Sequence, residues 1–395
     1  MEQPNPPLTE PFLAAVAESE KLVADADFIR DEADLAEGYD YLQGSIAAVL
    51  QLSRAHGTSH PYFVSSTGPY TKMGLDNPDT LYYHATIEPG AEYLVTGVRG
   101  STVDLSFQVL QGNYTAASVP GGEDAFDDRR LEIAADGSYA LRFGPPIDNP
   151  PSNYFPLGEG ASMLAVREVY GDWNAEQKGK IRIERVDTVG TAPAEPDVAR
   201  LRKRYQAAGR MLVTRMHTWF NFPKWFYLDL PVNTLTEPRL TPGGLSTQYS
   251  SVGHFDLAPD QALVITVPKS DAPYMGFQLG SRWYISLDYV NHQTSLNHAQ
   301  AQVDPDGMIR MVVSASNPGI ANWIETTGRS LGILQFRWQR VDRPVTPAEG
   351  PTIELVPVDK VAERLPYFER NRIDAHGWQE RIAARQRGFA ERMLG

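Results

Sequence analysis

Short runs of alternating apolar and polar residues, separated by glycine, proline, asparagine and aspartate, fill most of the chain from residue 62 to residue 341. Successive side chains of a strand point to opposite faces, so this alternation predicts half-buried strands. The frequent turn residues between the runs favour an antiparallel sandwich over alternating strands and helices. In the first half we expect strands at residues 81–87, 92–97, 103–109, 138–143, 161–169 and 180–186.

Three other segments carry apolar residues at helical spacing. Residues 8–56 predict a helical layer that covers an edge of the β structure. Residues 196–220 predict a connecting helix whose aromatic end is buried between two sheets. After Val341 a proline-rich, extended segment leads to residues 359–394, which predict a pair of terminal helices with mixed charge.

The β-rich part of the chain contains an internal repeat with an offset of 170 residues. This offset relates His84 to His254, Phe107-Gln108 to Phe277-Gln278, Asp136-Gly137 to Asp306-Gly307 and Arg167 to Arg337. A slip of one residue then relates Asn153-Tyr154 to Asn322-Trp323. A constant offset over about 80 residues, with two turn sequences included, indicates two copies of one β domain.

We therefore predict a mainly β protein with two tandem antiparallel, jelly-roll-like β-sandwiches related by the repeat. Helices are expected before, between and after the sandwiches. The expected domains are a helical layer at 1–61, a first sandwich at 62–190, a linker helix at 191–230, a second sandwich at 231–345 and a C-terminal part at 346–395. A chain of 395 residues exceeds the usual size of one core, which agrees with two domains.

Composition narrows the classes of partner and chemistry. The formal net charge is −13 and no long basic run occurs, so we expect neither nucleic acid nor a membrane as a partner. The chain has no cysteine, which excludes disulfides, thiolate nucleophiles and cysteine-ligated metals. P-loop, dinucleotide-binding, nucleophile-elbow and metalloprotease motifs are also absent, so no cofactor is expected. The N-terminus does not resemble a signal peptide, and we expect a soluble, cytoplasmic protein, with a homo-oligomer left open.

Two stretches resemble a known pair of bacterial families. KMGLDNPDTLYYHATI, residues 72–87, resembles the signature of the domain-of-unknown-function family numbered 1254. The region from His254 to Val341, with GFQLGSRWYISLDY and NPGIANWIETTG, resembles the family numbered 1214, its usual C-terminal companion. The first stretch departs from the pattern by carrying Asp-Asn-Pro-Asp-Thr where Asn-Asn-Asp-Thr is frequent. The resemblance implies two jelly-roll-like sandwiches and no established activity.

The stretch GFQLGSRWYISLDYVNH, residues 276–292, concentrates aromatic residues with a carboxylate and an imidazole. If it is a strand with its following turn, Trp283 and Tyr289 lie on one face, and Tyr284 and Asp288 lie on the other. The repeat gives three of these positions small or neutral counterparts in the first copy. Asn113 corresponds to Trp283, Ser118 to Asp288 and Val119 to Tyr289. The second copy has therefore gained groups that a core alone does not require.

Asp288 is the candidate for catalysis in this stretch. A partly desolvated carboxylate has a raised pKa and can act as a general base, with His292 as its partner four residues later. Trp283, Tyr284 and Tyr289 would then form the walls of a pocket. The alternatives are that Asp288 faces solvent or pairs with Arg282 or Arg337, and that His292 is a surface residue.

Further candidates for ligand binding are polar residues of the two predicted copies. Asn77, Tyr82 and His84 would line the mouth of the first sandwich, and Gln278 and His254 occupy the second copy. Each of the two histidines lacks a second histidine two residues further on, so we expect no transition-metal site. Whether Asp76 and Asp79 bind a hard cation or only shape a turn is left open.

Two functions from different classes fit these observations. The first is an enzyme without an organic cofactor, of the hydrolase or lyase type, acting on a small, largely apolar or aromatic molecule. The second is a protein that binds a small molecule or a carbohydrate without catalysis. A purely structural role would leave Asp288 in solvent.

Overall fold

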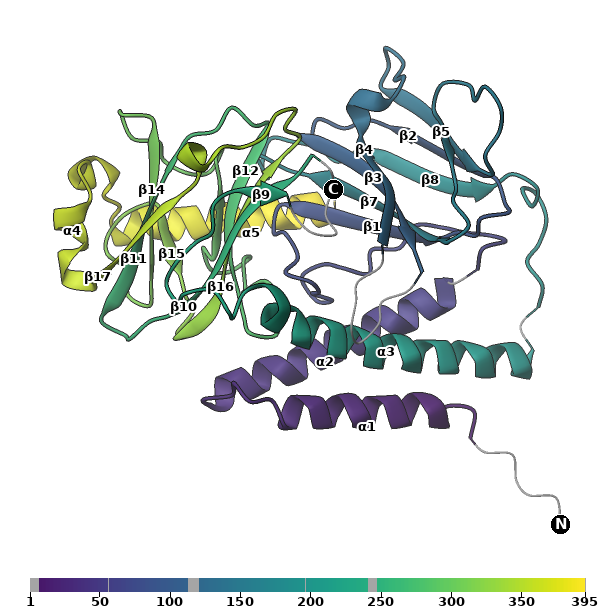
Figure 1. Cartoon of the computed structure of the whole chain (residues 1–395), viewed down its shortest axis with the longest axis horizontal. Coiled ribbons are helices and arrows are strands. Elements are labelled where there is room, and N and C mark those ends of the chain that lie inside the picture. The colour runs from purple at the N-terminus through teal and green to yellow at the C-terminus, as the bar shows by residue number, and fades with distance from the viewer. Residues whose placement is uncertain (1–6, 56, 113–120, 196, 241–246, 395) are drawn as a thin grey trace.

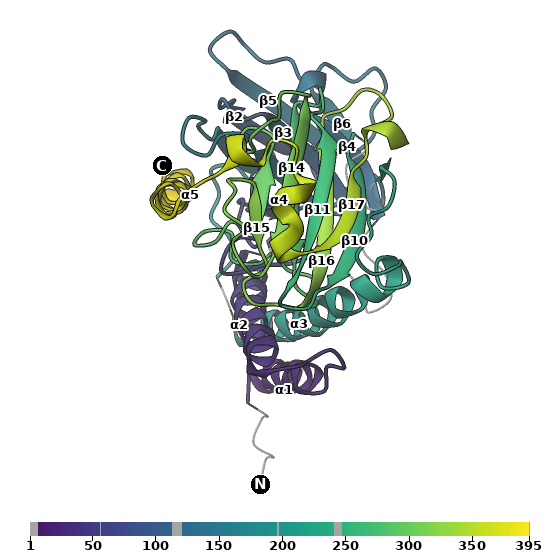
Figure 2. The ribbon, with the colours of Figure 1, turned by 90° about the vertical axis from the view of Figure 1, so that its left-hand side faces the viewer.

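Two β-sandwiches lie side by side in this computed structural model, which describes residues 7–55, 57–112, 121–195, 197–240 and 247–394 (Figure 1). A layer of three helices runs beneath both sandwiches, and the C-terminal helix lies along one side of the second (Figures 1 and 2). The helices are α1 (Glu10–Ala24), α2 (Glu32–Ala55), α3 (Val198–Phe226), α4 (Val361–Arg364) and α5 (Ala375–Leu394). The predicted fold class, two sandwiches with helical additions, is confirmed.

The first sandwich consists of two four-stranded sheets. The sheet nearer the second sandwich has the order β1-β7-β3-β4, and the other has the order β6-β5-β2-β8. The strands are β1 (Thr80–Thr86), β2 (Tyr93–Val98), β3 (Asp104–Gln111), β4 (Gly121–Asp127), β5 (Ser138–Gly144), β6 (Tyr154–Pro156), β7 (Ala161–Val169) and β8 (Lys180–Arg185). The six expected strands are all present, while β4 and the short β6 were not predicted.

The second sandwich repeats this topology. Its sheets have the orders β13-β12-β16-β10-β9 and β15-β14-β11-β17. The strands are β9 (Arg239–Leu240), β10 (Tyr249–Asp256), β11 (Gln261–Pro268), β12 (Tyr274–Gly280), β13 (Ser295–Asn297), β14 (Met308–Ser314), β15 (Trp323–Glu325), β16 (Leu331–Gln339) and β17 (Thr352–Pro357). The proline-rich segment expected to be merely extended therefore contributes β17, which pairs with β11.

The strands reproduce the repeat seen in the sequence. β14 and β16 begin and end 170 residues after β5 and β7, and β15 begins 169 residues after β6, as the predicted slip requires. One register differs, because Thr80 pairs with Val169 whereas Ser250 pairs with Arg337. A shift of two residues leaves every side chain on its face, so the sheet survives it. The sandwiches are not wholly antiparallel, since β6 and β15 pair in parallel with β5 and β14.

The central strands of the two neighbouring sheets are buried on both faces. Phe107 and Phe277 point into the hydrophobic cores of their own sandwiches. The adjacent residues Gln108 and Gln278 point away from those cores, yet both are almost completely buried. Polar side chains therefore lie inside the molecule where the two sandwiches meet.

The helical layer has its own hydrophobic core, to which Phe12, Leu212 and Trp283 contribute. The helical layer expected at residues 8–56 consists of two helices, because the side chain of Asp31 accepts a hydrogen bond from the Asp34 amide and starts the second helix. α3 is continuous to Phe226, with Pro223 in its last turn. Among the described residues, no helix is both long enough and apolar enough to cross a membrane.

The predicted strand in residues 276–292 ends early. β12 stops at Gly280, and the following residues form a loop before β13 begins at Ser295. Tyr284 in this loop has a φ of 57°, which no strand accommodates. The period-two reading of residues 283–289 is therefore wrong, and these side chains are not distributed over two faces of a sheet.

Candidate functional site

The loop from Ser281 to Thr294 separates the aromatic residues that were expected to form one pocket. Trp283 is buried in the helical layer, where its ring centroid lies 4.7 Å from that of Phe28 and its Nε1 donates to the Asp34 carbonyl at 3.1 Å. Tyr284 lies in a second cluster, stacked on Phe222 with 4.6 Å between centroids. These rings fill cores, so they do not form a common wall around a ligand.

Tyr289 belongs to a third cluster, which lies at the junction of the two sandwiches. Its ring packs at 6.2 Å from that of Trp173 in the first sandwich and at 6.3 Å from that of Phe389 on α5. Of the three predicted pocket aromatics, Tyr289 alone contacts both halves of the chain and α5. It marks the region where the structure places a pocket.

Asp288 does not have the properties expected of a general base. Its Oδ1 accepts hydrogen bonds from the amides of Val290 and Asn291 at 2.9 and 3.0 Å, and its Oδ2 accepts one from Asn291 Nδ2 at 2.9 Å. Burial raises the pKa of this carboxyl, but the hydrogen bonds from Asn291 and Val290 outweigh it and lower the pKa below its usual value. The expectation of a raised pKa is therefore wrong, and Asp288 caps its own turn.

His292 is not paired with Asp288. Its Nδ1 lies 2.9 Å from Oε2 of Glu325, at the end of β15, and its side chain is 41% exposed. The predicted catalytic pair is thus not formed. The counterparts Asn113, Ser118 and Val119, on which the asymmetry between the copies rested, lie outside the described residues.

The stretch that resembles the family signature forms a polar connection between the sandwiches. Asp76 accepts hydrogen bonds from the Ser286 amide at 3.2 Å and from Ser286 Oγ at 2.9 Å, and its carbonyl accepts one from Gln278 Nε2 at 2.9 Å. Arg337 donates to the Gln278 side chain and to the Leu75 carbonyl. Residues before β1 thereby satisfy polar groups of the second sandwich.

Asp79 anchors the same connection from the other side. It accepts hydrogen bonds from Trp173 Nε1 and from the Tyr274 hydroxyl, both at 2.7 Å. Asn77 Oδ1 accepts from Tyr274 at 3.1 Å, and the Asn77 amide donates to the Tyr82 hydroxyl at 2.9 Å. Burial raises the pKa of Asp79 and of Tyr82. Both groups are held within the protein.

The acidic residues of this stretch are occupied by protein donors. The side chains of Asp76 and Asp79 accept hydrogen bonds from hydroxyl, indole and amide groups of the chain. In the part of the chain that the structure describes, no group of three histidine, aspartate or glutamate side chains is placed to hold a metal ion. The hydrogen bonds of these two carboxylates reach distant segments, and the local turn is instead closed by Asn77, whose Oδ1 accepts a hydrogen bond from the Asp79 amide at 3.1 Å.

The two repeated histidines are placed apart from each other. His84 is partly buried on β1, where its Nδ1 lies 3.0 Å from Ser66 Oγ, and desolvation together with the charges of Arg167 and Arg215 lowers its pKa to about 3. His254 on β10 lies with Nε2 2.8 Å from the Leu230 carbonyl. A histidine with such a low pKa is neutral at physiological pH and donates or accepts according to its tautomer.

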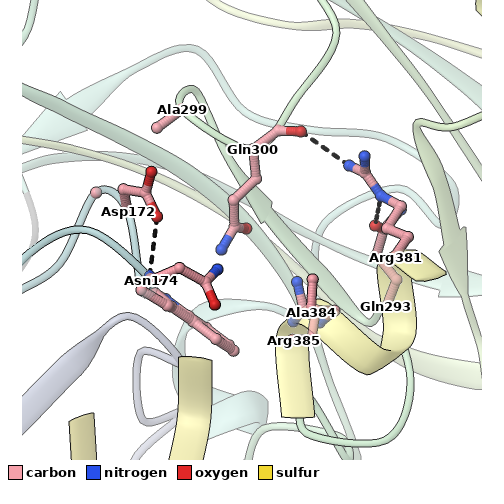
Figure 3. Close-up of a pocket in the computed structure, with 10 residues that line it drawn as sticks. Asp172, Asn174, Gln293, Ala299, Gln300, Arg381, Ala384 and Arg385 are labelled. Carbon is pink, nitrogen blue, oxygen red and sulfur yellow. Dashed lines mark hydrogen bonds between the residues drawn. The ribbon is translucent and has the colours of Figure 1, made fainter. Parts of the chain in front are cut away.

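A pocket of about 200 Å³ lies beside Tyr289, between the two sandwiches and α5 (Figure 3). Three parts of the chain line it: the loop after β7, the segments around β13, and α5. The lining residues are Gly171, Asp172, Trp173, Asn174, Gln293, Ala299, Gln300, Arg381, Ala384 and Arg385. None of the residues predicted from the sequence is among them, although Tyr289 and Asp79 lie directly behind Trp173.

α5 is held against this region by its arginines. Arg385 donates from Nε and Nη2 to the Tyr289 carbonyl at 3.1 and 2.9 Å, and from Nη1 to the Ser295 carbonyl at 3.1 Å. The guanidinium carbons of Arg385 and Arg392 lie 4.7 and 4.1 Å from the centroid of the Trp173 ring. Gly388 permits this approach, because a Cβ there would lie 2.9 Å from Trp173 Cβ.

The sequence contained one signal for this pocket that the prediction did not use. Arg381 and Arg385 are four residues apart on a helix, and neither has an acidic residue three or four positions away. Arginines on a solvated helix face are commonly paired at those spacings. The absence of acidic residues at these spacings indicates that Arg381 and Arg385 make contacts outside the helix. Trp173, Asn174 and Gln293 gave no such signal, because only folding brings their loops to α5.

Comparisons with known proteins support the fold. A scan against protein-family models finds no match, and a search of curated proteins finds none, so the resemblance to the two families remains a prediction. A solved structure of a Vibrio parahaemolyticus protein is 11% identical, with a TM-score of 0.45, and covers 86% of this chain and 99% of its own. An uncharacterised protein from Burkholderia cenocepacia is 27% identical, with a TM-score of 0.80, over 90% of this chain and 98% of that chain. This chain is thus similar in fold, over nearly its whole length, to an uncharacterised protein of known structure.

Proposed function

We propose that this protein binds a small organic molecule, without transforming it, in the pocket between the two sandwiches and α5. The pocket carries the proposal, since it is a cavity of about 200 Å³ to which both repeat copies and the C-terminal helix contribute. Ligand pockets commonly form at domain interfaces and combine apolar surface with a few polar groups. Here the apolar surface comes mainly from Ala299 and Ala384, and the polar groups are amides and guanidinium groups.

The size of the cavity limits the ligand. Pockets for drug-sized molecules have volumes of roughly 300 to 1,000 Å³, so a cavity of 200 Å³ suits a single ring or a short chain. This agrees with the small, partly apolar molecule expected from the sequence. Apolar contact would come from Ala299 and Ala384 in place of Trp283, Tyr284 and Tyr289, because Trp173 is only 2% exposed.

The enzyme hypothesis has weaker support than the binding hypothesis. A general base must be within hydrogen-bonding reach of its substrate and must have a suitable pKa. Asp288 is engaged with Val290 and Asn291, and its pKa is lowered. Of the described lining residues, Asp172 alone is a carboxylate, and its Oδ1 accepts a hydrogen bond from the Asn174 amide at 2.9 Å.

The proposal can be tested by filling the pocket. Ala384 lines it and Ala383, its neighbour on α5, does not, so Ala384→Leu and Ala383→Leu are a matched pair. The full chain and both variants would be titrated with benzoate, succinate, phenol and glucose by calorimetry. We expect at least one probe to bind the native protein. That probe should bind Ala384→Leu at least tenfold more weakly, and Ala383→Leu with an affinity within twofold of native. Failure of all four probes, or equal binding by both variants, would overturn the proposal.

A further inference from the structure

The pocket contains more positive charge than its surroundings neutralise. Arg381 and Arg385 both line it, and neither forms an ion pair within 4 Å with a carboxylate of the described residues. The charges of Asp79 and Asp288 act on Arg385 from a greater distance. Asp172, the acidic residue of the lining, is exposed. A buried guanidinium group without a paired carboxylate is costly, which makes this placement informative.

Hydrogen bonds leave part of the Arg381 guanidinium group free. Its Nε donates to Oε1 of Gln293, and its Nη2 donates to the Gln300 carbonyl at 2.8 Å (Figure 3). Nη1 has no hydrogen-bond partner among the described residues. Because the two bonds fix the guanidinium plane, the remaining N–H groups are held in place before any ligand arrives.

Neutral donors lie close to the two arginines. In Figure 3 the side-chain amides of Gln300 and Asn174 converge on the space beside α5. Gln293, which fixes Arg381, is completely buried and also donates to the Ala321 carbonyl at 2.9 Å. Amide and guanidinium N–H groups together suit an acceptor with several oxygen lone pairs.

We infer that the ligand of this pocket is a small monocarboxylate, whose carboxyl group meets Arg381 and whose apolar part lies against Ala299 and Ala384. This inference rests on the proposed function, because it names the class of molecule for the same site. The apolar lining distinguishes an organic acid from an inorganic anion, which would use the charges alone. Burial lowers the pKa of Arg381 to about 10 and that of Arg385 to about 9, so both remain charged at neutral pH.

The test compares two arginines of the same helix. Arg381 lines the pocket, whereas Arg387 is exposed outside it, and replacing either by glutamine removes one positive charge from α5. Benzoate, phenol and inorganic phosphate would be titrated against the native chain, Arg381→Gln, Arg381→Lys and Arg387→Gln. We expect the native chain to bind benzoate more tightly than phenol or phosphate. Benzoate should bind Arg381→Gln at least tenfold more weakly than the native chain, and Arg387→Gln with an affinity within twofold of native.

The outcomes separate this inference from the proposed function. If phenol binds as tightly as benzoate and Ala384→Leu abolishes both, the pocket binds small molecules but the carboxylate assignment is wrong. Phosphate binding as tight as that of benzoate would also overturn the assignment to an organic acid. Arg381→Lys keeps the positive charge. A circular dichroism spectrum like that of the native chain would establish that this variant is folded. Unchanged benzoate binding to Arg381→Gln would likewise overturn the inference.

Discussion

The two sandwiches share their topology but differ in how the polar faces between them are satisfied. Gln108 and Gln278 occupy equivalent positions on β3 and β12 and are equally buried. Gln278 donates to the Asp76 carbonyl and accepts from Arg337, whereas Oε1 of Gln108 has no partner among the described residues. The segment that completes the second sandwich precedes the first one in the chain. A duplicated domain thus acquires its polar partners from outside the repeat.

A second equivalent pair shows the same contrast. Tyr274 on β12 donates its hydroxyl to Asp79 at 2.7 Å, while its counterpart Asp104 on β3 lies beside Asp127 and Asp128. Arg340 lies 3.9 Å from Asp104 but 2.8 Å from Asp128, so it compensates Asp128 more strongly. Burial and the neighbouring Asp127 raise the pKa of Asp104 to about 7. The second copy thus has a neutral donor, Tyr274, at the position where the first copy has Asp104, whose charged form is disfavoured.

The largest expected effect is a pH dependence that originates in the first sandwich. Because the pKa of Asp104 is higher in the folded state than in the unfolded chain, its proton stabilises the fold below about pH 4, and this stability is lost as the pH rises through 7. The pKa of about 7 corresponds to a loss of about 3 kcal/mol between pH 5 and pH 8. We expect Asp104→Asn to remove most of this dependence in urea unfolding. An identical pH profile for the variant and the native chain would contradict the assignment, and the exposed Asp148→Asn serves as the control.

Replacing the equivalent glutamines tests the comparison directly. Gln278→Leu leaves a guanidinium N–H of Arg337 and the Asp76 carbonyl without partners, which is expected to cost about 2 kcal/mol. Gln108→Leu removes a buried oxygen that has no partner among the described residues, so its effect is expected to lie within about 1 kcal/mol of zero. Chemical denaturation of both variants measures the difference. Equal losses of stability would show that Gln108 and Gln278 are equally well hydrogen-bonded, which would contradict the comparison.

The smallest expected effect concerns Asp288, whose counterpart in the first copy is Ser118. Asp288→Ala removes three hydrogen bonds that fix the turn at residues 288–291, and we expect a loss of about 1 kcal/mol in unfolding free energy. Binding of benzoate to the pocket should change by less than twofold, because Asp288 does not line it. A larger loss of binding with a native fold would restore Asp288 to a functional role.

Much of the fold could be predicted because it depends on local pattern. Alternation of apolar residues located β1, β2, β3, β5, β7 and β8, and the repeat extended this to the second sandwich. The same rule failed after Gly280, because a run of aromatic and β-branched residues can be buried in a loop as well as in a strand. Trp283 is buried by α2 and α3, which are distant in sequence.

The candidate site could not be predicted in the same way. Asn77, Tyr82, His84 and Gln278 were chosen as polar residues on strands or at their ends, and they lie in or near the buried polar region between the sandwiches. The pocket itself combines Trp173, Gln293 and Arg381, which three unrelated segments supply. No periodicity connects such residues.

The sequence by itself determined where most strands of the first sandwich lie and that the β domain is duplicated, because side-chain alternation and a fixed offset are properties of the chain alone. The tertiary structure decided which polar residues face each other, how Asp288 is hydrogen-bonded and where a cavity remains. These depend on how the two sandwiches and α5 pack together. Side chains become buried, and charges are left without a partner, only when distant segments meet. The pKa shifts and the ligand binding that depend on them therefore also require the tertiary structure.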